Sequence, residues 1–400
     1  MNQAYIYDAI RTPRGRAKDS GGLYDLTPLD LMKTLYDAME QRTGIDKNKV
    51  EDVILGCVTQ AVEQAANVAK TSLLYAGWPA HIPGITVNRF CSSGLDAINF
   101  AALKINAGQA SMALAGGVEM MSRVPMLSDK ASVFADPQLA TRCRMLMMGS
   151  GADLIASQYD VSREEADCIA ALSQQRAAAA RDNGWFTSII PVENTVKGIT
   201  VEQDECIRAQ TTVEGLADMA PSFEGLGAKG IDAFQLQANP DLNSISHVHT
   251  AGNSPAMADG AALVLVGDES VGEAYGIKPR AKIVAATSLC DDPLTVISGC
   301  AAATQQLMQQ QGITSADVDL FELHEAFAAT VVKCQRDLDI SEDKLNVNGG
   351  VIALGHPMGA TGAVMAGMLL DELERRDQRV GIVAASGAAG TGTAMLIERC

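Results

Sequence analysis

Two residues stand where nucleophilic catalysis could occur. Cys91, in VNRFCSSG, lies between a predicted strand and the start of a predicted helix. The positive end of a helix dipole and free backbone N–H groups stabilise a thiolate at such a place, although most cysteines are simply buried core residues. His356, in GHPMGATGA, stands in a tight turn before another helix and is the best candidate for a base that deprotonates a thiol.

Two further segments carry groups of chemical interest at the ends of predicted strands. His324 and Glu325, in LHEAFAAT, follow an apolar strand and begin a helix. A zinc-binding HExxH motif would need a second histidine where the chain has Ala328, so the zinc interpretation fails. The Gly/Ala-rich loop AASGAAGTG (384–392) could place backbone N–H groups near an anion or oxyanion. It lacks the GKS or GKT of a P-loop and the pattern of a dinucleotide site.

The elements that must position these residues form an internal repeat with a spacing of roughly 265 residues. Both halves alternate strands and helices, and their continuous apolar strands are of the buried, parallel type. In each half a Val-Asn step precedes a turn that opens a helix, and a pseudo-twofold arrangement would bring the turns of Cys91 and His356 together. The expected elements are 4–13, 26–45, 50–58 and 111–122 in the first half, and 280–289, 292–313, 316–327, 347–363 and 380–396 in the second.

The region between the halves is Met-rich and irregular, and its one clear helix covers 162–185. Ser162 followed by Glu165 predicts a capping box at the start of that helix. We expect this region to be an inserted lid or loop domain. The expected domains are a first core over 1–122 plus 247–275, the lid over 123–246 and a second core over 276–400.

The composition indicates a soluble α/β enzyme with large cores. Of the 400 residues, 47% are hydrophobic and 20% charged, which excludes disorder. A net charge of −17 argues against nucleic acid or an anionic membrane surface as the main partner. No apolar run is long enough for a membrane span, and the N-terminus looks like a strand rather than a signal peptide. The nine cysteines lack regular spacing and are expected to be reduced thiols in a cytoplasmic protein.

Five motifs, in order, resemble those of the thiolase family: VNRFCSSGLDAI, AGGVEMMS, TAGN followed by DGAA, HEAF, and NVNGGVIALGHPMGATGA. The resemblance covers essentially the whole chain, and the last motif is highly specific. It implies an α/β thiolase fold, in which two duplicated βαβαβ-type cores stack as five αβαβα layers and an inserted loop domain covers CoA. It also implies cleavage of 3-ketoacyl-CoA with CoA, or the reverse Claisen condensation, through an acyl-cysteine intermediate. CoA would be a co-substrate, with no metal or tightly bound cofactor.

By this resemblance Cys91 is the nucleophile and His356 is its general base. His324 stands where most thiolases carry Asn, and HEAF is similar to the thiolase subunits of the fatty-acid-oxidising trifunctional enzymes. There, this side chain and His356 form an oxyanion hole for the thioester carbonyl, and Glu325 orients them. The backbone N–H groups of Cys91 and Ala388 are expected to form the other oxyanion hole.

The resemblance also suggests contacts with CoA and reveals two departures from the family pattern. Arg208, in ECIRAQTT, matches a family arginine near the CoA nucleotide. Ser254 is expected near the pantetheine, but the family often has serine one place later, where this chain has Pro255. Ser386 aligns with a second reactive cysteine that moves a proton at the substrate carbon. Because a hydroxyl is far less acidic than a thiol, Ser386 should be a poor proton shuttle unless it is strongly activated.

Two other functions stay open at this stage. One is a decarboxylating condensing enzyme of the same superfamily, which generates its carbanion by losing carbon dioxide and needs no second acid/base cysteine. The other is a CoA-binding subunit with impaired turnover. The expected partners are acyl-CoA, CoA, further copies of the chain in a homodimer or homotetramer, and other β-oxidation enzymes in a complex.

Overall fold

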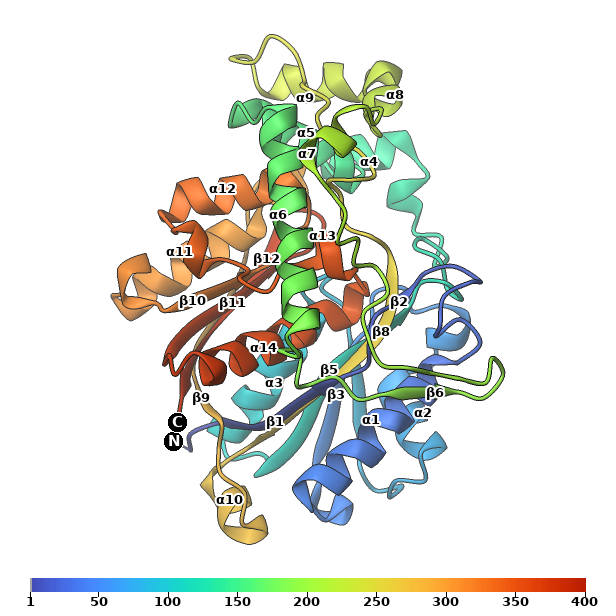
Figure 1. The fold of residues 1–400 in the computed structure, drawn as a ribbon, viewed down its shortest axis with the longest axis vertical. Helices are drawn as coiled ribbons and strands as arrows, with labels where there is room; N and C mark the ends of the chain where they lie inside the picture. Colours follow the sequence, from blue (N-terminus) through green and yellow to red (C-terminus); the bar gives the residue numbers. More distant parts are fainter. Residues whose placement is uncertain (1) are drawn as a thin grey trace.

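The computed structural model describes residues 2–400 and contains two halves of similar architecture (Figure 1). The first half comprises β1 (Tyr5–Arg11), β2 (Gly15–Arg16), α1 (Pro28–Thr43), β3 (Asp52–Gly56), α2 (Val68–Tyr75), β4 (Gly84–Val87), α3 (Ser93–Asn106), β5 (Met112–Met120) and β8 (Ala258–Gly267). After α10 (Glu269–Tyr275), the second half comprises β9 (Ala281–Cys290), α11 (Gly299–Gln311), β10 (Leu320–Leu323), α12 (Ala328–Leu338), α13 (Val351–Leu354), α14 (Met358–Arg375), β11 (Val380–Ser386) and β12 (Thr391–Arg399). The alternation of strands and helices expected from the sequence is present in both halves.

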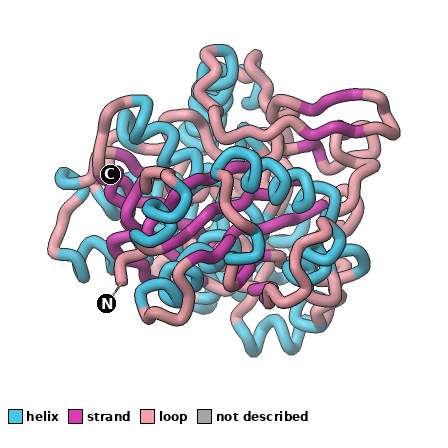
Figure 2. Tube along the Cα trace, turned by 90° about the horizontal axis from the view of Figure 1, so that it is seen from below, coloured by secondary structure: helices cyan, strands magenta, loops and turns pink. Residues whose placement is uncertain are grey.

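The secondary structure forms five layers. Three hydrophobic cores fill the spaces between them, because one core extends over both faces of the central helices. Helices α1 and α2 pack on the outer face of the first-half strands. Helices α3 and α14 lie between the first-half and second-half strands, and they share one core with both. Helices α11 and α12 cover the outer face of the second-half strands. In the view from below, strands run between helices on either side, as the expected αβαβα stacking requires (Figure 2).

The strands form one mixed sheet rather than two parallel ones. Its order is β10-β11-β12-β9-β1-β8-β5-β3-β4, and a short pairing of β1 with β9 joins the two halves. Only the pairs β3–β4, β3–β5 and β10–β11 are parallel, so the expectation of parallel strands is wrong for the other pairs. Strands β5 and β8 pair antiparallel although every residue in both is buried. Helices cover both faces here, so a continuous apolar run reports burial and not strand direction.

The segment 123–246, called the lid below, is more helical than its sequence indicates. It contains α4 (Pro137–Cys143), α5 (Met148–Gln158), α6 (Arg163–Asp182), β6 (Val192–Asn194), β7 (Ile199–Val201), α7 (Val213–Ala217), α8 (Glu224–Leu226), η4 (Gly227–Ile231) and α9 (Asp232–Ala238). The expectation of a single clear helix is wrong because the others have only 3 to 11 residues, which leaves little periodic signal. Within residues 2–400, no helix is long and apolar enough to cross a membrane.

Two parts of the lid pack on different cores. The short helices α4, α5, α8 and α9 lie together at the top of Figure 1, where α5 packs against α12 of the second half. The β6–β7 hairpin lies beside the first half, and its residues Val192 and Val201 belong to the core under α1. Helix α6 begins as predicted, because the Ser162 hydroxyl accepts the Glu165 N–H at 3.1 Å. The reciprocal bond of a capping box is not formed, since the Glu165 carboxylate pairs with Arg336 instead.

Candidate active site

Cys91 and His356 are 265 residues apart in the sequence and meet in the folded chain. The distance from His356 Nε2 to Cys91 Sγ is 3.1 Å. His356 Nδ1 lies 2.8 Å from the Thr361 hydroxyl, and its backbone N–H donates to the Ala256 carbonyl at 2.8 Å. With the proton on Nδ1 and donated to Thr361, Nε2 is the acceptor that a general base needs.

The local chain directions explain why the cysteine reaches the histidine. Between β4 and α3, Phe90 adopts a left-handed conformation with φ +48°, and its N–H donates to the Asn88 side chain at 2.9 Å. This turn leaves Cys91 just before the first turn of α3, as the sequence predicts. Gly355 has φ +97°, and a Cβ there would lie 2.8 Å from Ala258 Cβ. The position before His356 therefore requires glycine.

The first turn of α14 docks closely on the first half. The Gly359 carbonyl oxygen would lie 2.5 Å from a Cβ at Gly56, 2.7 Å from one at Gly94 and 2.2 Å from one at Gly117. The Gly359 N–H donates to the Glu119 carboxylate at 2.9 Å. These glycines let the His356 turn approach Cys91 without a side chain between the backbones.

Glu119 is a fully buried carboxylate that the sequence reasoning missed. Besides the Gly359 N–H, it accepts the N–H groups of Val58 and Thr59 and the Gln64 side chain at 2.7–3.0 Å. Burial raises the pKa of Glu119, although these donors oppose the shift. The sequence could have indicated a special role for Glu119, because it is the one charged residue of the apolar strand β5. A carboxylate with four donors from three segments fixes those segments relative to one another.

Burial favours the neutral forms of Cys91 and His356. It raises the pKa of the Cys91 thiol to about 12, and the charge of Glu119 acts in the same direction. Cys91 keeps some accessible surface, but protein surrounds its sulfur. Burial also lowers the pKa of His356 well below its ordinary value, and His324 and Arg14 reinforce this shift. Desolvation of Cys91 opposes the stabilisation of a thiolate expected at the helix start, and that expectation stays a prediction.

His324 packs against His356, with ring centroids 4.6 Å apart. Burial lowers the pKa of His324 to about 4, and the nearby Ser386 backbone opposes only part of this shift. Neither ring nitrogen of His324 has a hydrogen-bond partner in the part of the chain that the structure describes. A neutral imidazole always carries one N–H, and the Ser386 backbone lies close enough to raise the pKa of the ring but not in hydrogen-bonding geometry.

The hydrogen bonds of Glu325 go to residues around the site and not to His324 or His356. Its carboxylate accepts the Ser173 hydroxyl at 2.8 Å, the Ile352 N–H at 3.2 Å and the Asn346 side chain at 3.3 Å. Across residues 2–400, it makes no hydrogen bond to either catalytic histidine. Ile352 belongs to α13, which leads into the turn of His356, so the contact of Glu325 with this part of the chain is to the backbone before that turn.

The loop at 384–392 contributes two groups. The Ser386 hydroxyl is fully buried and accepts the N–H of Cys300 at 2.8 Å, at the start of the 13-residue helix α11. Its role in proton transfer stays a prediction. The Ala388 N–H donates to no acceptor among the described residues although Ala388 is buried. Unpaired N–H groups at buried residues are rare, and the expected role of this one as an oxyanion donor stays a prediction.

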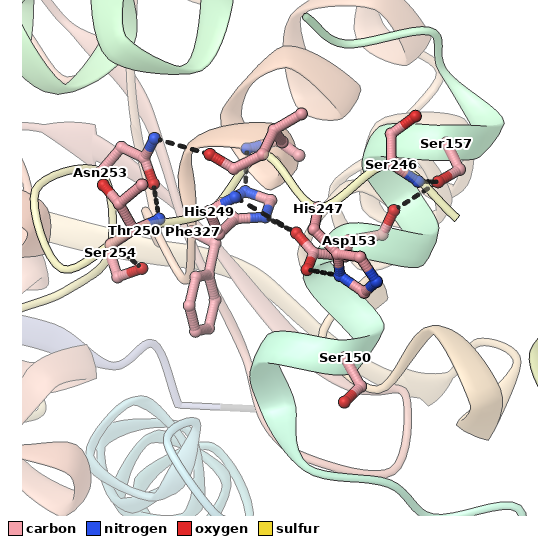
Figure 3. A network of polar contacts seen from close by, with 12 residues as sticks. Ser150, Asp153, Ser157, Ser246, His247, His249, Thr250, Asn253, Ser254 and Phe327 are labelled. Atoms are coloured by element: carbon pink, nitrogen blue, oxygen red, sulfur yellow. Dashed lines mark hydrogen bonds and ion pairs between the residues drawn. The ribbon is translucent and has the colours of Figure 1, made fainter. Parts of the chain in front are cut away.

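Arg208 and Ser254 lie near the catalytic turn. Arg208 is exposed, and Cys206, two residues earlier, borders Gly355. The Ser254 hydroxyl donates to the Thr250 carbonyl at 2.6 Å (Figure 3). The contacts of both residues with CoA stay predictions.

A buried ion cluster behind His356 also escaped the sequence analysis. Arg14 donates to the Gly355 carbonyl at 3.3 Å, and Asp204 pairs with both Arg11 and Arg14. Burial alone would raise the pKa of Asp204, but the two arginines lower it to about 2. The sequence could have indicated this cluster through the two arginines in IRTPRG, which stand at the end of an apolar strand.

Comparisons with known proteins agree along the entire chain. The family model described as "Thiolase, N-terminal domain" matches residues 4–230, and "Thiolase, C-terminal domain" matches residues 277–399. The chain is 38% identical to a beta-ketoadipyl-CoA thiolase of Acinetobacter baylyi and 37% identical to a 3-ketoacyl-CoA thiolase of Cronobacter sakazakii, with 100% of each sequence covered. The crystal structure of the Bacillus anthracis acetyl-CoA acetyltransferase is similar, with a TM-score of 0.87, 32% identity and coverage of 100% of this chain and 99% of that one.

The neutral state of the pair predicts a distinct pH dependence for alkylation of Cys91. A thiol with a raised pKa exposes more thiolate with every increase in pH, so the rate with iodoacetamide should rise from weakly acidic to alkaline pH without a plateau. His356→Ala should slow alkylation at neutral pH, because no base then takes the proton. Mass spectrometry of the peptide containing Cys91 measures both rates. A plateau that begins at acidic pH would reveal a thiolate–imidazolium pair and contradict this assignment, as would an unchanged profile in His356→Ala.

Proposed function

This chain belongs to the thiolase family, and from that premise we propose that it cleaves 3-ketoacyl-CoA with CoA, or catalyses the reverse condensation, through an acyl group on Cys91. The enzyme is accordingly an acyltransferase of the thiolase type. The observation that carries the proposal is the 3.1 Å contact between His356 Nε2 and the Cys91 sulfur. Unpartnered N–H groups at His324 and Ala388 support it.

In the first step the Cys91 sulfur attacks the keto carbon of the substrate while its proton passes to His356 Nε2. The keto oxygen takes up the developing negative charge and accepts the N–H groups of Cys91 and Ala388. Because His356 is neutral before the step, it can accept the proton at neutral pH. Fixed donors around the oxygen need no rearrangement when the charge develops.

In the second step the bond between the keto carbon (C3) and the neighbouring carbon C2 breaks, and acetyl-CoA leaves as a carbanion on C2. Its charge spreads to the thioester oxygen, where His324 and the now protonated His356 donate. The carbanion takes a proton from the group at position 386. The thiol of CoA then gives its proton to the Ser386 oxygen and attacks the acyl group on Cys91. The shortened acyl-CoA leaves, and the Cys91 sulfur takes back the proton held by His356.

The surroundings of Ser386 favour its role as the proton carrier. Its oxygen accepts the Cys300 N–H at the positive end of α11, and both features stabilise negative charge on that oxygen. This is the activation that a hydroxyl needs in place of a thiol.

We propose that CoA binds as a co-substrate beside the catalytic turn, with Arg208 at its nucleotide and Ser254 near its pantetheine. A chain with a net charge of −17 attracts an anionic ligand only through such local groups. No tightly bound cofactor is needed, since the thioester supplies the activation. We further propose a cytoplasmic location and association with other β-oxidation enzymes.

A decarboxylating condensing enzyme is the second candidate function. The hydroxyl at Ser386 favours it, because loss of carbon dioxide creates the carbanion without a thiol as acid or base. Two neutral histidines beside the cysteine would stabilise the resulting enolate equally well.

The acyl intermediate is tested by mixing the enzyme with acetyl-CoA and analysing its peptides by mass spectrometry. One acetyl adduct should appear on the peptide that contains Cys91, since this sulfur is the one in contact with the base. Cys91→Ala should lose the adduct and thiolysis but keep CoA binding. An adduct on another residue, or turnover that persists in Cys91→Ala, would refute the assignment.

Position 386 is tested by Ser386→Cys, with exchange of the acetyl-CoA methyl protons in deuterated water as the measurement. A thiol is the stronger acid, so exchange and thiolysis should both rise while the rate of Cys91 acylation changes little. If exchange stays unaltered, the role given to Ser386 is wrong. Decarboxylation of malonyl-CoA by the native enzyme, without thiolysis, would favour the second candidate.

Homo-oligomer formation through the first half is the remaining part of the proposal. Strand β4 is the last in the sheet order, so one of its edges is unpaired within the chain. Ile85 on this strand is 49% exposed, and on α3 Leu103 is 60% exposed and Phe100 36%. An unpaired edge beside exposed apolar side chains favours contact with a second copy.

Light scattering should therefore give at least twice the mass of one chain at micromolar concentration. Ile85→Arg should shift the protein toward monomer because it places a charge on the proposed contact. Val196→Arg, at an exposed position near the tip of the β6–β7 hairpin, should leave the mass unchanged. A monomeric native protein, or equal effects of the two variants, would contradict a first-half interface.

A further inference from the structure

Two buried carboxylates of the lid helices bind the same short segment of the chain. This segment, residues 247–254, follows the lid and leads toward β8, and we call it the joint segment. Asp153 of α5 lies 2.7 Å from His249 Nδ1 (Figure 3). Asp167 of α6 accepts the Asn253 side chain at 2.8 Å. Because a buried carboxylate is costly without a donor, these two bonds fix the joint segment on the lid helices.

The hydrogen bonds of His249 determine which of its ring nitrogens carries the proton. Its Nε2 lies 3.2 Å from the backbone nitrogen of Ala329, whose N–H donates to it. A ring nitrogen that accepts a hydrogen bond carries no proton, so the proton of this imidazole is on Nδ1 and is donated to Asp153. The ring is fully buried, and the second oxygen of Asp153 lies 2.8 Å from His247 Nδ1. Asp153 therefore sets both the tautomer and the orientation of His249.

The joint segment in turn satisfies the first two N–H groups of α12. The first N–H groups of a helix have no acceptor within that helix. In α12 the Ala328 N–H donates to the Asn253 carbonyl at 3.3 Å, and the Ala329 N–H donates to His249 Nε2 at 3.2 Å. Neither acceptor is close to α12 in the sequence, so the start of this helix depends on a tertiary contact.

The start of α12 is one of two anchors for the turn that carries His324. At the other end of this turn, the His324 N–H donates to the Ala384 carbonyl of β11 at 3.0 Å. The His324 side chain has no hydrogen-bond partner among residues 2–400, so no bond of its own directs it. Its direction is therefore set by the backbone between the two anchors and by its contact with His356.

We propose that Asp153 and His249 are positioning residues that hold His324 where it donates to the thioester oxygen of the departing acetyl-CoA. They act through the start of α12 and not on the substrate. This inference rests on the proposed thiolase reaction and adds two residues to it. In that reaction only the carbanion step uses His324, because the oxygen formed when Cys91 attacks a carbonyl accepts other N–H groups. Loss of the pair should therefore slow the carbanion step and spare acylation of Cys91.

The test measures the two steps separately. Thiolysis of acetoacetyl-CoA includes the carbanion step, whereas acetylation of Cys91 by acetyl-CoA needs the nucleophile, its base and CoA binding but no carbanion. His249→Asn keeps an N–H toward Asp153 and loses the acceptor of the Ala329 N–H. It should lower kcat for thiolysis by about tenfold or more, since a small displacement of a catalytic group is costly, and leave the acetylation rate within about twofold. His249→Gln, whose side-chain oxygen can reach the place of Nε2, should restore much of kcat.

His247→Asn is the matched control, because His247 binds the same carboxylate but makes no hydrogen bond to α12 within residues 2–400. It should leave both rates unchanged. A second variant, Ala329→Pro, removes the N–H itself, and proline is tolerated in the first turn of a helix. Because His249→Asn and Ala329→Pro break the same bond, the double variant should lose no more kcat than the more impaired single variant.

The inference is overturned if His249→Asn keeps the native kcat, if acetylation of Cys91 falls as much as thiolysis, or if His247→Asn has the same effect. It is also overturned if the two losses of kcat multiply in the double variant. Should His249→Asn fail to fold, the same two rates in Ala329→Pro decide. A native enzyme that neither cleaves acetoacetyl-CoA nor becomes acetylated on Cys91 would instead refute the proposed function.

Discussion

The docking of the first turn of α14 on the first half of the chain is the constraint on which the rest of the site depends. Gly56, Gly94 and Gly117 leave room for the Gly359 carbonyl, and any larger residue there would place a Cβ 2.2–2.7 Å from that oxygen. The Glu119 carboxylate takes up the Gly359 N–H and ties the same turn to the loop after β3. Two turns that belong to different halves of a repeat are thereby held close enough for a histidine to contact a cysteine.

Such close packing also sets the electrostatics of the pair. Excluding water raises the pKa of Cys91 and lowers that of His356, which favours a neutral thiol beside a neutral imidazole. In the proposed reaction, attack on a substrate carbonyl would move the charge from the sulfur to an oxygen with its own donors.

The lid is coupled to this centre through the segment that carries His324. His249 donates to Asp153 of the lid, and its other ring nitrogen accepts the Ala329 N–H at the start of α12. Its ring packs on Phe327, with centroids 5.3 Å apart. Asp153 of the lid is therefore two contacts away from the HEAF segment that carries His324.

Sequence alone was sufficient for the repeat, the placement of Cys91 and His356 at two helix starts, and the five-layer family fold, because periodicity, glycine turns and motif order are local patterns. Tertiary structure decided the rest. Neighbours from distant segments determine the pKa of Cys91, the hydrogen-bond partner of Glu325, the N–H group that donates to Ser386 and the contacts of Glu119. No local sequence pattern encodes which donor lies beside a residue or how far water is excluded from it. The mixed sheet and the short lid helices escaped prediction for a related reason, since burial hides strand direction and a few residues carry too little periodicity.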